Sequence, residues 1–149
     1  MKSSKYGPGN TDFSKLKCQR PVFYHWNKLD YQFKGCGQTA LGFLTGAWPN
    51  RKENLPLNDK YVRNFLRQYR IRSFEINKAN LSNKKEPSLS ITDQHVVLVS
   101  LLMKKSESSW IVLYNSKMIH NLDIMEVSYL HLLNYPWRSG YVLYREDWK

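Results

Sequence analysis

Apolar residues recur at helical spacing in two segments of the first half of the chain. The segment CGQTALGFLTG predicts a helix that starts at or just after Cys36 and that Gly46 and Pro49 end. Along residues 58–69 the apolar positions repeat every three, four and seven residues, and Asn58 is suited to cap the start. The pattern therefore predicts two helices in this half.

The second half of the chain has the texture of β-strands. The run HVVLVSLLM, which starts at His95, is nearly continuously apolar, as in a buried strand. The run WIVLYN, which ends at Asn115, predicts a second strand, and the KKSESS segment between the two predicts a hairpin turn. IRSFEI (71–76) and YVLYR (141–145) predict two further strands.

Residues 123–133 return to helical spacing, and Asp123 with Glu126 resembles a capping box, so we expect a third helix there. Helices come first along the chain and antiparallel strands second, which favours the α+β class. Residues 1–20 are rich in Lys, Ser and Gly and predict a basic, flexible arm before a single domain over residues 21–149.

Composition narrows the class of protein but not its partner. The chain has 149 residues, 42% of them apolar, which is enough for one globular core. Its net charge of +11 indicates attraction to nucleic acid, anionic membrane or an acidic protein, without choosing among them. No apolar run reaches the roughly 18 residues of a membrane span, and no secretory signal is recognisable. We expect reduced thiols at Cys18 and Cys36, in the cytoplasm or after delivery without a signal peptide.

Cys36 is the first candidate for chemistry. A thiol attacks as thiolate, and both the positive end of a helix and a nearby imidazolium favour that form. Cys36 has the first device if the predicted helix starts there, and its backbone N–H would be free to bind an oxyanion. Gly37 would leave open space for a substrate backbone.

His95 and Asn115 are the candidates to complete such a site. His95 heads a predicted buried strand, and Asn115 closes the next strand, so the hairpin brings both to the same end. An amide oxygen there would accept from the imidazole and fix its tautomer.

The segment GCGQTAL at residues 35–41 resembles the nucleophile segment of papain-like peptidases of the bacteriocin-leader-processing, double-glycine type, in which a Cys-Gly pair begins the central helix. The helix and strand over 58–76 and the two strands from His95 to Asn115 are similar in order and interval. The resemblance spans residues 32–144. It implies a papain-like α+β fold, in which N-terminal helices, the nucleophile helix among them, pack on a C-terminal antiparallel sheet.

The resemblance implies the roles of Cys36 as nucleophile, His95 as base and Asn115 as the residue that orients the base. Asp93 and Asp123 are alternatives to Asn115. It also implies a Gln shortly before the nucleophile whose amide completes the oxyanion hole.

Gln32 fits that position, four residues before Cys36, and Gln19 is its rival. The chain departs from many members of the family, which have Asp-Pro where this chain has Asn115-Ser116 and Pro followed by a small residue where it has Gln38-Thr39. These departures bear on substrate specificity.

The resemblance leads to a thiol-dependent amide hydrolase, first of all a cysteine peptidase with a peptide or protein substrate. An alternative keeps the site in a papain-fold effector or toxin that deamidates protein glutamine or cuts other amides. Such a protein would meet an acidic partner, or a cognate inhibitor or immunity protein. We expect no cofactor and no metal, because the two cysteines and four histidines lack metal-site spacing.

The same residues also have structural interpretations. Cys36 can be a small buried residue, His95 a satisfied strand-end histidine and Asn115 a turn residue. A third hypothesis is then a basic, non-enzymatic binding module. Its candidate surface is the cationic face of the second helix, which is either merely solvated or docks an acidic partner or a phosphate backbone, although no nucleic-acid motif is recognisable. The cations of that face are Lys60, Arg63, Arg67 and Arg70.

Overall fold

The computed structural model describes residues 11–27, 29, 35–49, 57–82, 86–104, 107–120 and 123–149. Its helical elements are η2 (Phe13–Leu16), α2 (Cys36–Thr45), α3 (Asp59–Gln68), α4 (Ala79–Ser82), η3 (Pro87–Leu89), η4 (Tyr129–Asn134) and η5 (Glu146–Trp148), where η marks a 3-10 turn. Its strands are β1 (Arg72–Glu75), β2 (Val96–Lys104), β3 (Glu107–Tyr114), β4 (Lys117–His120), β5 (Asp123–Glu126) and β6 (Trp137–Tyr144). Helices and an antiparallel sheet share one chain, so the α+β class is confirmed.

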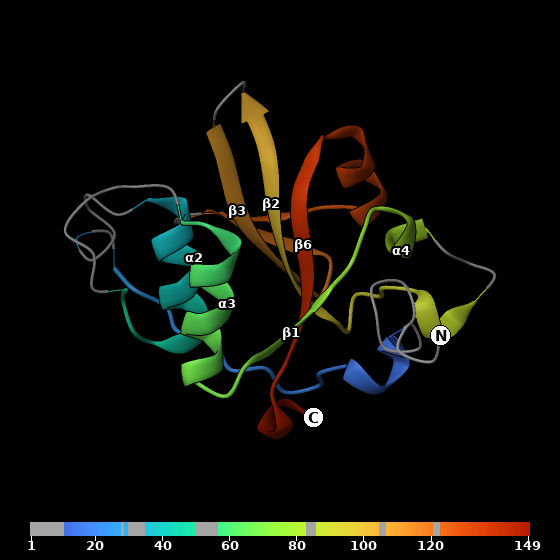
Figure 1. Ribbon diagram of the computed structural model, residues 1–149, viewed down its shortest axis with the longest axis horizontal. Coiled ribbons are helices and arrows are strands. Elements are labelled where there is room, and N and C mark those ends of the chain that lie inside the picture. The colour runs from blue at the N-terminus through green and yellow to red at the C-terminus, as the bar shows by residue number, and fades with distance from the viewer. Residues whose placement is uncertain are drawn as a thin grey trace.

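The strands form one antiparallel sheet in the order β1-β6-β2-β3-β4-β5. The late strand β6 therefore lies between β1 and β2, and β1 and β5 are the two edges. Helices α2 and α3 cover one face of the sheet, and α4 with η2, η3 and η4 lies on the other (Figure 1). The central strands are buried between these layers and supply fully buried residues such as Val97, Val112 and Leu143.

Local sequence accounts for the ends of both long helices. The Asn58 side chain accepts from the backbone N–H of Tyr61 at 2.8 Å and caps α3, as expected. Helix α2 starts at Cys36 and ends at Gly46, whose φ of 77° lies in the left-handed region that glycine tolerates.

Arg70 follows α3 in the same left-handed region, with φ 63°. The N–H groups of Arg70 and Ile71 donate to carbonyls of the last turn of α3. The left-handed position that Arg70 occupies after the helix usually carries glycine. An arginine there is held by the surrounding bonds at a cost of about 1 kcal/mol.

The prediction of a third helix over residues 123–133 is wrong. Asp123–Glu126 is strand β5, paired with Lys117–His120 of β4, and only a 3-10 turn follows at Tyr129–Asn134. A short amphipathic pattern does not decide between helix and strand when a neighbouring strand offers a ladder of backbone hydrogen bonds.

The prediction of a flexible arm is wrong for residues 11–20. Phe13 and Cys18 are fully buried there and Leu16 is nearly so. The backbone N–H of Cys18 bonds to the carbonyl of Gln94 at 2.8 Å, which ties this segment to the start of β2. Residues 1–10 lie outside the described part of the chain.

Candidate functional site

Cys36 lies at the start of α2, as the sequence predicts. Its side chain is half-buried, and its Sγ accepts from the backbone N–H of Trp110 on β3 at 3.3 Å. The space expected above Gly37 is absent, because a Cβ there would lie 3.0 Å from side-chain carbons of both Leu57 and Trp110. Gly37 therefore permits close packing of α2 on the sheet and does not open a path for a substrate.

His95 is a core residue. It is fully buried, and its ring meets the Phe13 ring edge-on with centroids 6.5 Å apart. Nε2 lies 2.6 Å from the Phe13 carbonyl oxygen, which only accepts, so Nε2 carries the proton. Nδ1 accepts from the backbone N–H of Thr92 at 2.9 Å. Burial lowers the pKa of His95, and these bonds suit its neutral form.

Cys36 and His95 are far apart in the structure. Trp110, which donates to Cys36, pairs with Ser100, five residues beyond His95, and at about 3.3 Å per strand residue that is roughly 16 Å. The two residues also face opposite layers: Cys36 belongs to α2, while His95 contacts η2, on the other side of the sheet (Figure 1). The expected nucleophile–base contact is therefore not formed.

The direction of α2 explains this separation. Phe43, in its last turns, stacks on Phe23 with ring centroids 4.6 Å apart, and Phe23 meets Tyr114 at 5.8 Å. Tyr114 lies at the end of β3 that is next to the start of β2, and Trp110 lies farther along β3. The C-terminal end of α2 is therefore at the His95 end of the hairpin, and Cys36 is at the far end.

Asn115 is a turn residue. Asn115 and Ser116 have φ values of 54° and 58° and join the paired residues Tyr114 and Lys117, which is the geometry of a two-residue type I′ hairpin. The hairpin does bring Asn115 to the His95 end, because its N–H bonds to the Asp93 carbonyl at 2.8 Å. Both ring nitrogens of His95 have other partners, however, so Asn115 does not orient it.

The remaining predicted site residues do not complete a triad. Gln32 lies outside the described residues, and its rival Gln19 is exposed in the segment before Pro21. Asp93 is exposed, and Asp123 is the cross-strand partner of His120 at the β5 edge.

No other described histidine is placed beside Cys36. His25 meets Phe43, with ring centroids 5.5 Å apart, and seven residues of helix, or about 10 Å, separate Phe43 from Cys36. His120 and His131 line a cavity on the opposite face of the sheet. What remains at Cys36 is a half-buried thiol at a helix start.

A different group of side chains gathers at the β1 edge. Arg63 and Arg67 of α3 and Arg72 of β1 line a hollow of about 250 Å³ together with Ser73 and Phe74. We call this hollow the arginine pocket. Arg63 is fixed there: its Nε donates to the Ser73 hydroxyl at 2.9 Å and an NH2 group donates to the Ser73 carbonyl at 3.1 Å.

Aromatic rings hold the third guanidinium. Arg72 lies 5.0 Å from the centroid of Phe74 and 5.9 Å from that of Tyr144, and Arg63 lies 5.0 Å from that of Tyr141. Such contacts fix a guanidinium plane and leave N–H groups at its edge for an acceptor.

Among the residues that the structure describes, little negative charge offsets the arginine pocket. Glu75 lies 3.8 Å from Arg63, across an exposed gap. Asp59 is engaged elsewhere, because it accepts a short hydrogen bond from the Tyr141 hydroxyl and pairs with Arg138 at 3.1 Å. Burial and this bond to Asp59 raise the pKa of Tyr141. Lys60 and Arg70 are also exposed nearby, so the local charge is strongly positive.

The sequence predicts part of this pocket and misses the rest. The stripe on the second helix includes Arg63 and Arg67, but Arg72 and Phe74 come from the strand. Alternation along IRSFEI places Arg72 and Phe74 on one side of an edge strand. That pattern is the sequence signal that could have added them to the predicted cationic surface.

Comparisons with known proteins identify no further site. No family model, no curated protein and no solved structure matches the chain. Within the part of the chain that the structure describes, no three His, Cys, Asp or Glu side chains gather to hold a metal ion. No helix there is long and apolar enough to cross a membrane.

Proposed function

We propose that the protein is a binding module that holds the phosphate backbone of a single-stranded nucleic acid against the arginine pocket. The observation that carries this proposal is that Arg63, Arg67 and Arg72 line one hollow at the β1 edge. Guanidinium forks match phosphate oxygens bidentately, and a bound phosphate would relieve the mutual repulsion of the three cations.

The chemistry of the hollow favours a nucleic acid over an acidic protein. The half-buried Phe74 also lines the hollow, with its ring 5.0 Å from the Arg72 guanidinium, and an aromatic ring beside a cation lets a base stack while its phosphate is neutralised. The net charge of +11 would bring any anionic polymer to the surface, and the pocket would determine where it stays.

The test is a salt series with a fluorescently labelled, single-stranded oligonucleotide. Each phosphate neutralised on a single strand contributes about 0.7 to the slope of log K against log salt, so removing two arginines should flatten the slope by about 1.4. We expect this from Arg67→Ala combined with Arg72→Ala. The matched control is Lys15→Ala with Lys117→Ala, which removes the same charge from exposed positions elsewhere.

Equal loss in both double variants would show that only net charge matters and would contradict the proposal. Tighter binding of an acidic peptide than of the oligonucleotide, at equal charge, would replace nucleic acid by an acidic protein as the partner.

A second candidate is a thiol-dependent amide hydrolase of papain-like type with Cys36 as nucleophile. The N–H of Trp110 donates to Sγ at the start of α2, and both the donor and the helix end favour a thiolate. His95 cannot be its base in this arrangement, so the candidate requires another proton acceptor.

Alkylation by iodoacetamide at near-neutral pH tests this second candidate. Cys18 is the internal reference, because it is fully buried and burial raises its pKa to about 11. A Cys36 rate well above that of glutathione at the same pH would support an activated thiol. A Cys36 rate at or below that of glutathione would rule out the hydrolase hypothesis. If the thiol is activated, the products distinguish the two activities: a peptidase creates new peptide termini, and a deamidase adds about one mass unit per glutamine.

A further inference from the structure

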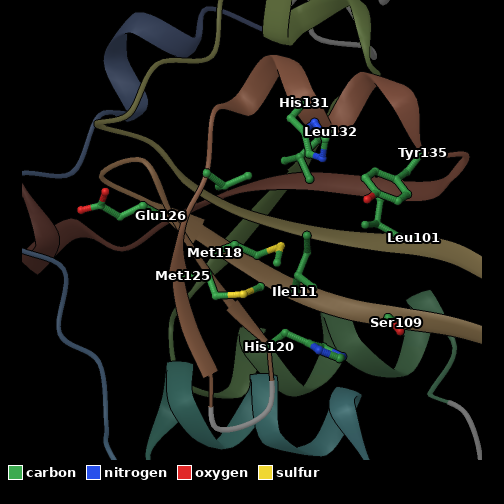
Figure 2. A pocket seen from close by; sticks show the side chains of 11 residues that line it. Leu101, Ser109, Ile111, Met118, His120, Met125, Glu126, His131, Leu132 and Tyr135 are labelled. Carbon is green, nitrogen blue, oxygen red and sulfur yellow. The ribbon is translucent and has the colours of Figure 1, made fainter.

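The face of the sheet opposite α2 and α3 carries a cavity of about 300 Å³ beside the β5 edge. Its floor is lined by Met118 and His120 of β4 and by Met125 of β5 (Figure 2). One wall is formed by His131 and Leu132 of η4. Its lining is mainly apolar, yet it includes two thioethers and two imidazoles. We call it the methionine pocket.

The strand register brings three of these donors together. Met118 and Met125 are direct cross-strand partners, so their Cβ atoms lie about 5 Å apart on one face of the sheet. His120 is two residues along β4 on the same face, about 7 Å from each methionine. Figure 2 shows both methionine side chains lying on the pocket floor. A methionine has three rotatable side-chain bonds, so both sulfurs can turn toward the His120 imidazole on the same face of the sheet.

The donor set selects one class of metal. Thioether and imidazole ligands are soft or borderline and favour Cu(I) and its analogue Ag(I), whereas Mg²⁺ and Ca²⁺ require oxygen ligands. Asp123, the cross-strand partner of His120, adds negative charge beside the site. Met125 is 49% exposed, so an ion can enter from solvent.

We propose that Met118, Met125 and His120 form a binding site for a soft monovalent cation, Cu(I) or Ag(I). No three His, Cys, Asp or Glu side chains of the described residues gather to hold a metal ion, so the two thioethers are essential to this site. The site is independent of nucleic-acid binding at the opposite edge of the sheet.

The experiment uses the full chain with Cys36→Ser, because a half-buried thiol would otherwise compete for the ion. Ag(I) is titrated into protein labelled with ¹³C at the methionine methyl groups, and Cu(I) affinity is measured by competition with a chromogenic chelator. The test variants are Met118→Leu with Met125→Leu, which keeps apolar volume, and His120→Gln. The matched control is Ile119→Leu with Ile124→Leu, the cross-strand pair on the other face.

We expect one ion per chain and shifted methyl signals for Met118 and Met125. Each lost ligand should weaken binding by about tenfold or more, so the double methionine variant should lose about 100-fold while the isoleucine control changes less than twofold. Unmoved methyl signals, or equal affinity in the double methionine variant, would overturn the proposal. Thermal unfolding of each variant shows that a loss of binding is not a loss of fold.

Discussion

The two edges of the sheet are strands of the same length with opposite surroundings. Beside β1 the exposed charge is mainly basic, with Glu75 as the exception, and the guanidinium of Arg63 covers the carbonyl of Ser73 on the edge itself. At β5 the flanking charges are acidic, Asp123 and Glu126, and Ile124 and Met125 are about half exposed. An unpaired edge invites non-native strand pairing, and charge is a common protection. Here each edge also has a hollow beside it, and the two hollows suit ligands of different chemistry.

That contrast gives each edge its own proposed ligand and its own set of variants. The arginine pocket presents guanidinium cations and suits a hard, multiply charged anion. The methionine pocket presents polarizable sulfur and a neutral imidazole and suits a soft cation. A change at one edge should therefore leave binding at the other edge intact.

The largest expected effect is charge reversal at β1. Arg67→Glu with Arg72→Glu should lower oligonucleotide affinity by about 100-fold at moderate salt, because two contacts are lost and two repulsions appear. Fluorescence anisotropy measures it. Silver binding at the methionine pocket should be unchanged, and its loss in the same variant would show that the two edges are not independent.

The next effect concerns the core between the edges. His95→Leu leaves the Thr92 N–H and the Phe13 carbonyl without their buried partner, which should cost about 2–3 kcal/mol of unfolding free energy. Urea unfolding measures this change. Both edges should lose binding only to the extent that the protein unfolds, and the alkylation rate of Cys36 in folded protein should stay within twofold. A tenfold slower alkylation in a still-folded variant would mean that His95 acts on Cys36.

A smaller effect sharpens the account of the β1 edge. Arg70→Gly relieves the left-handed backbone at φ 63° and should raise the unfolding free energy by about 0.5–1 kcal/mol. The same change removes a cation beside the arginine pocket and should weaken oligonucleotide binding about threefold. The control is Arg70→Lys, which keeps both the positive charge and the strained left-handed backbone. Unchanged affinity in the glycine variant would place Arg70 outside the binding surface.

The smallest effect is the dependence of stability on pH. Burial lowers the pKa values of His95 and His120 in the folded protein, so the unfolded chain takes up protons first as pH falls below the ordinary value near 6.5. Unfolding free energy should therefore be constant above that pH and fall as pH drops below it. Urea midpoints between pH 8 and pH 5 measure this, and His120→Gln should show a shallower fall. A midpoint that rises on acidification would contradict the assignment of both rings as neutral.

Local pattern predicts the elements well where periodicity is long. The start of α2 at Cys36, the Asn58 cap, β1 and the β2–β3 hairpin all follow from spacing, capping and turn residues. The type I′ turn at Asn115 also agrees with the preference of asparagine for left-handed backbone.

The assembly of the site could not be predicted in the same way. Whether Cys36 meets His95 depends on which way α2 runs across the sheet, and side chains distant in sequence decide that. Gly37 packs against Leu57 and Trp110 at one end of the helix, and Phe43 stacks on Phe23 at the other. The order of Cys36 and His95 along the chain therefore resembles that of the family, but order alone does not bring the two side chains into contact.

The central claim is that the anionic partner contacts the arginine pocket, and side-chain NMR tests it most directly. Titration of a short single-stranded oligonucleotide should shift the arginine Nε–H signals of Arg63, Arg67 and Arg72, together with the ring signals of Phe74, in proportion to the bound fraction. The methyl signals of Met118 and Met125 should not move. Shifts confined to other cations, with the signals of the three arginines unchanged at saturation, would contradict the account.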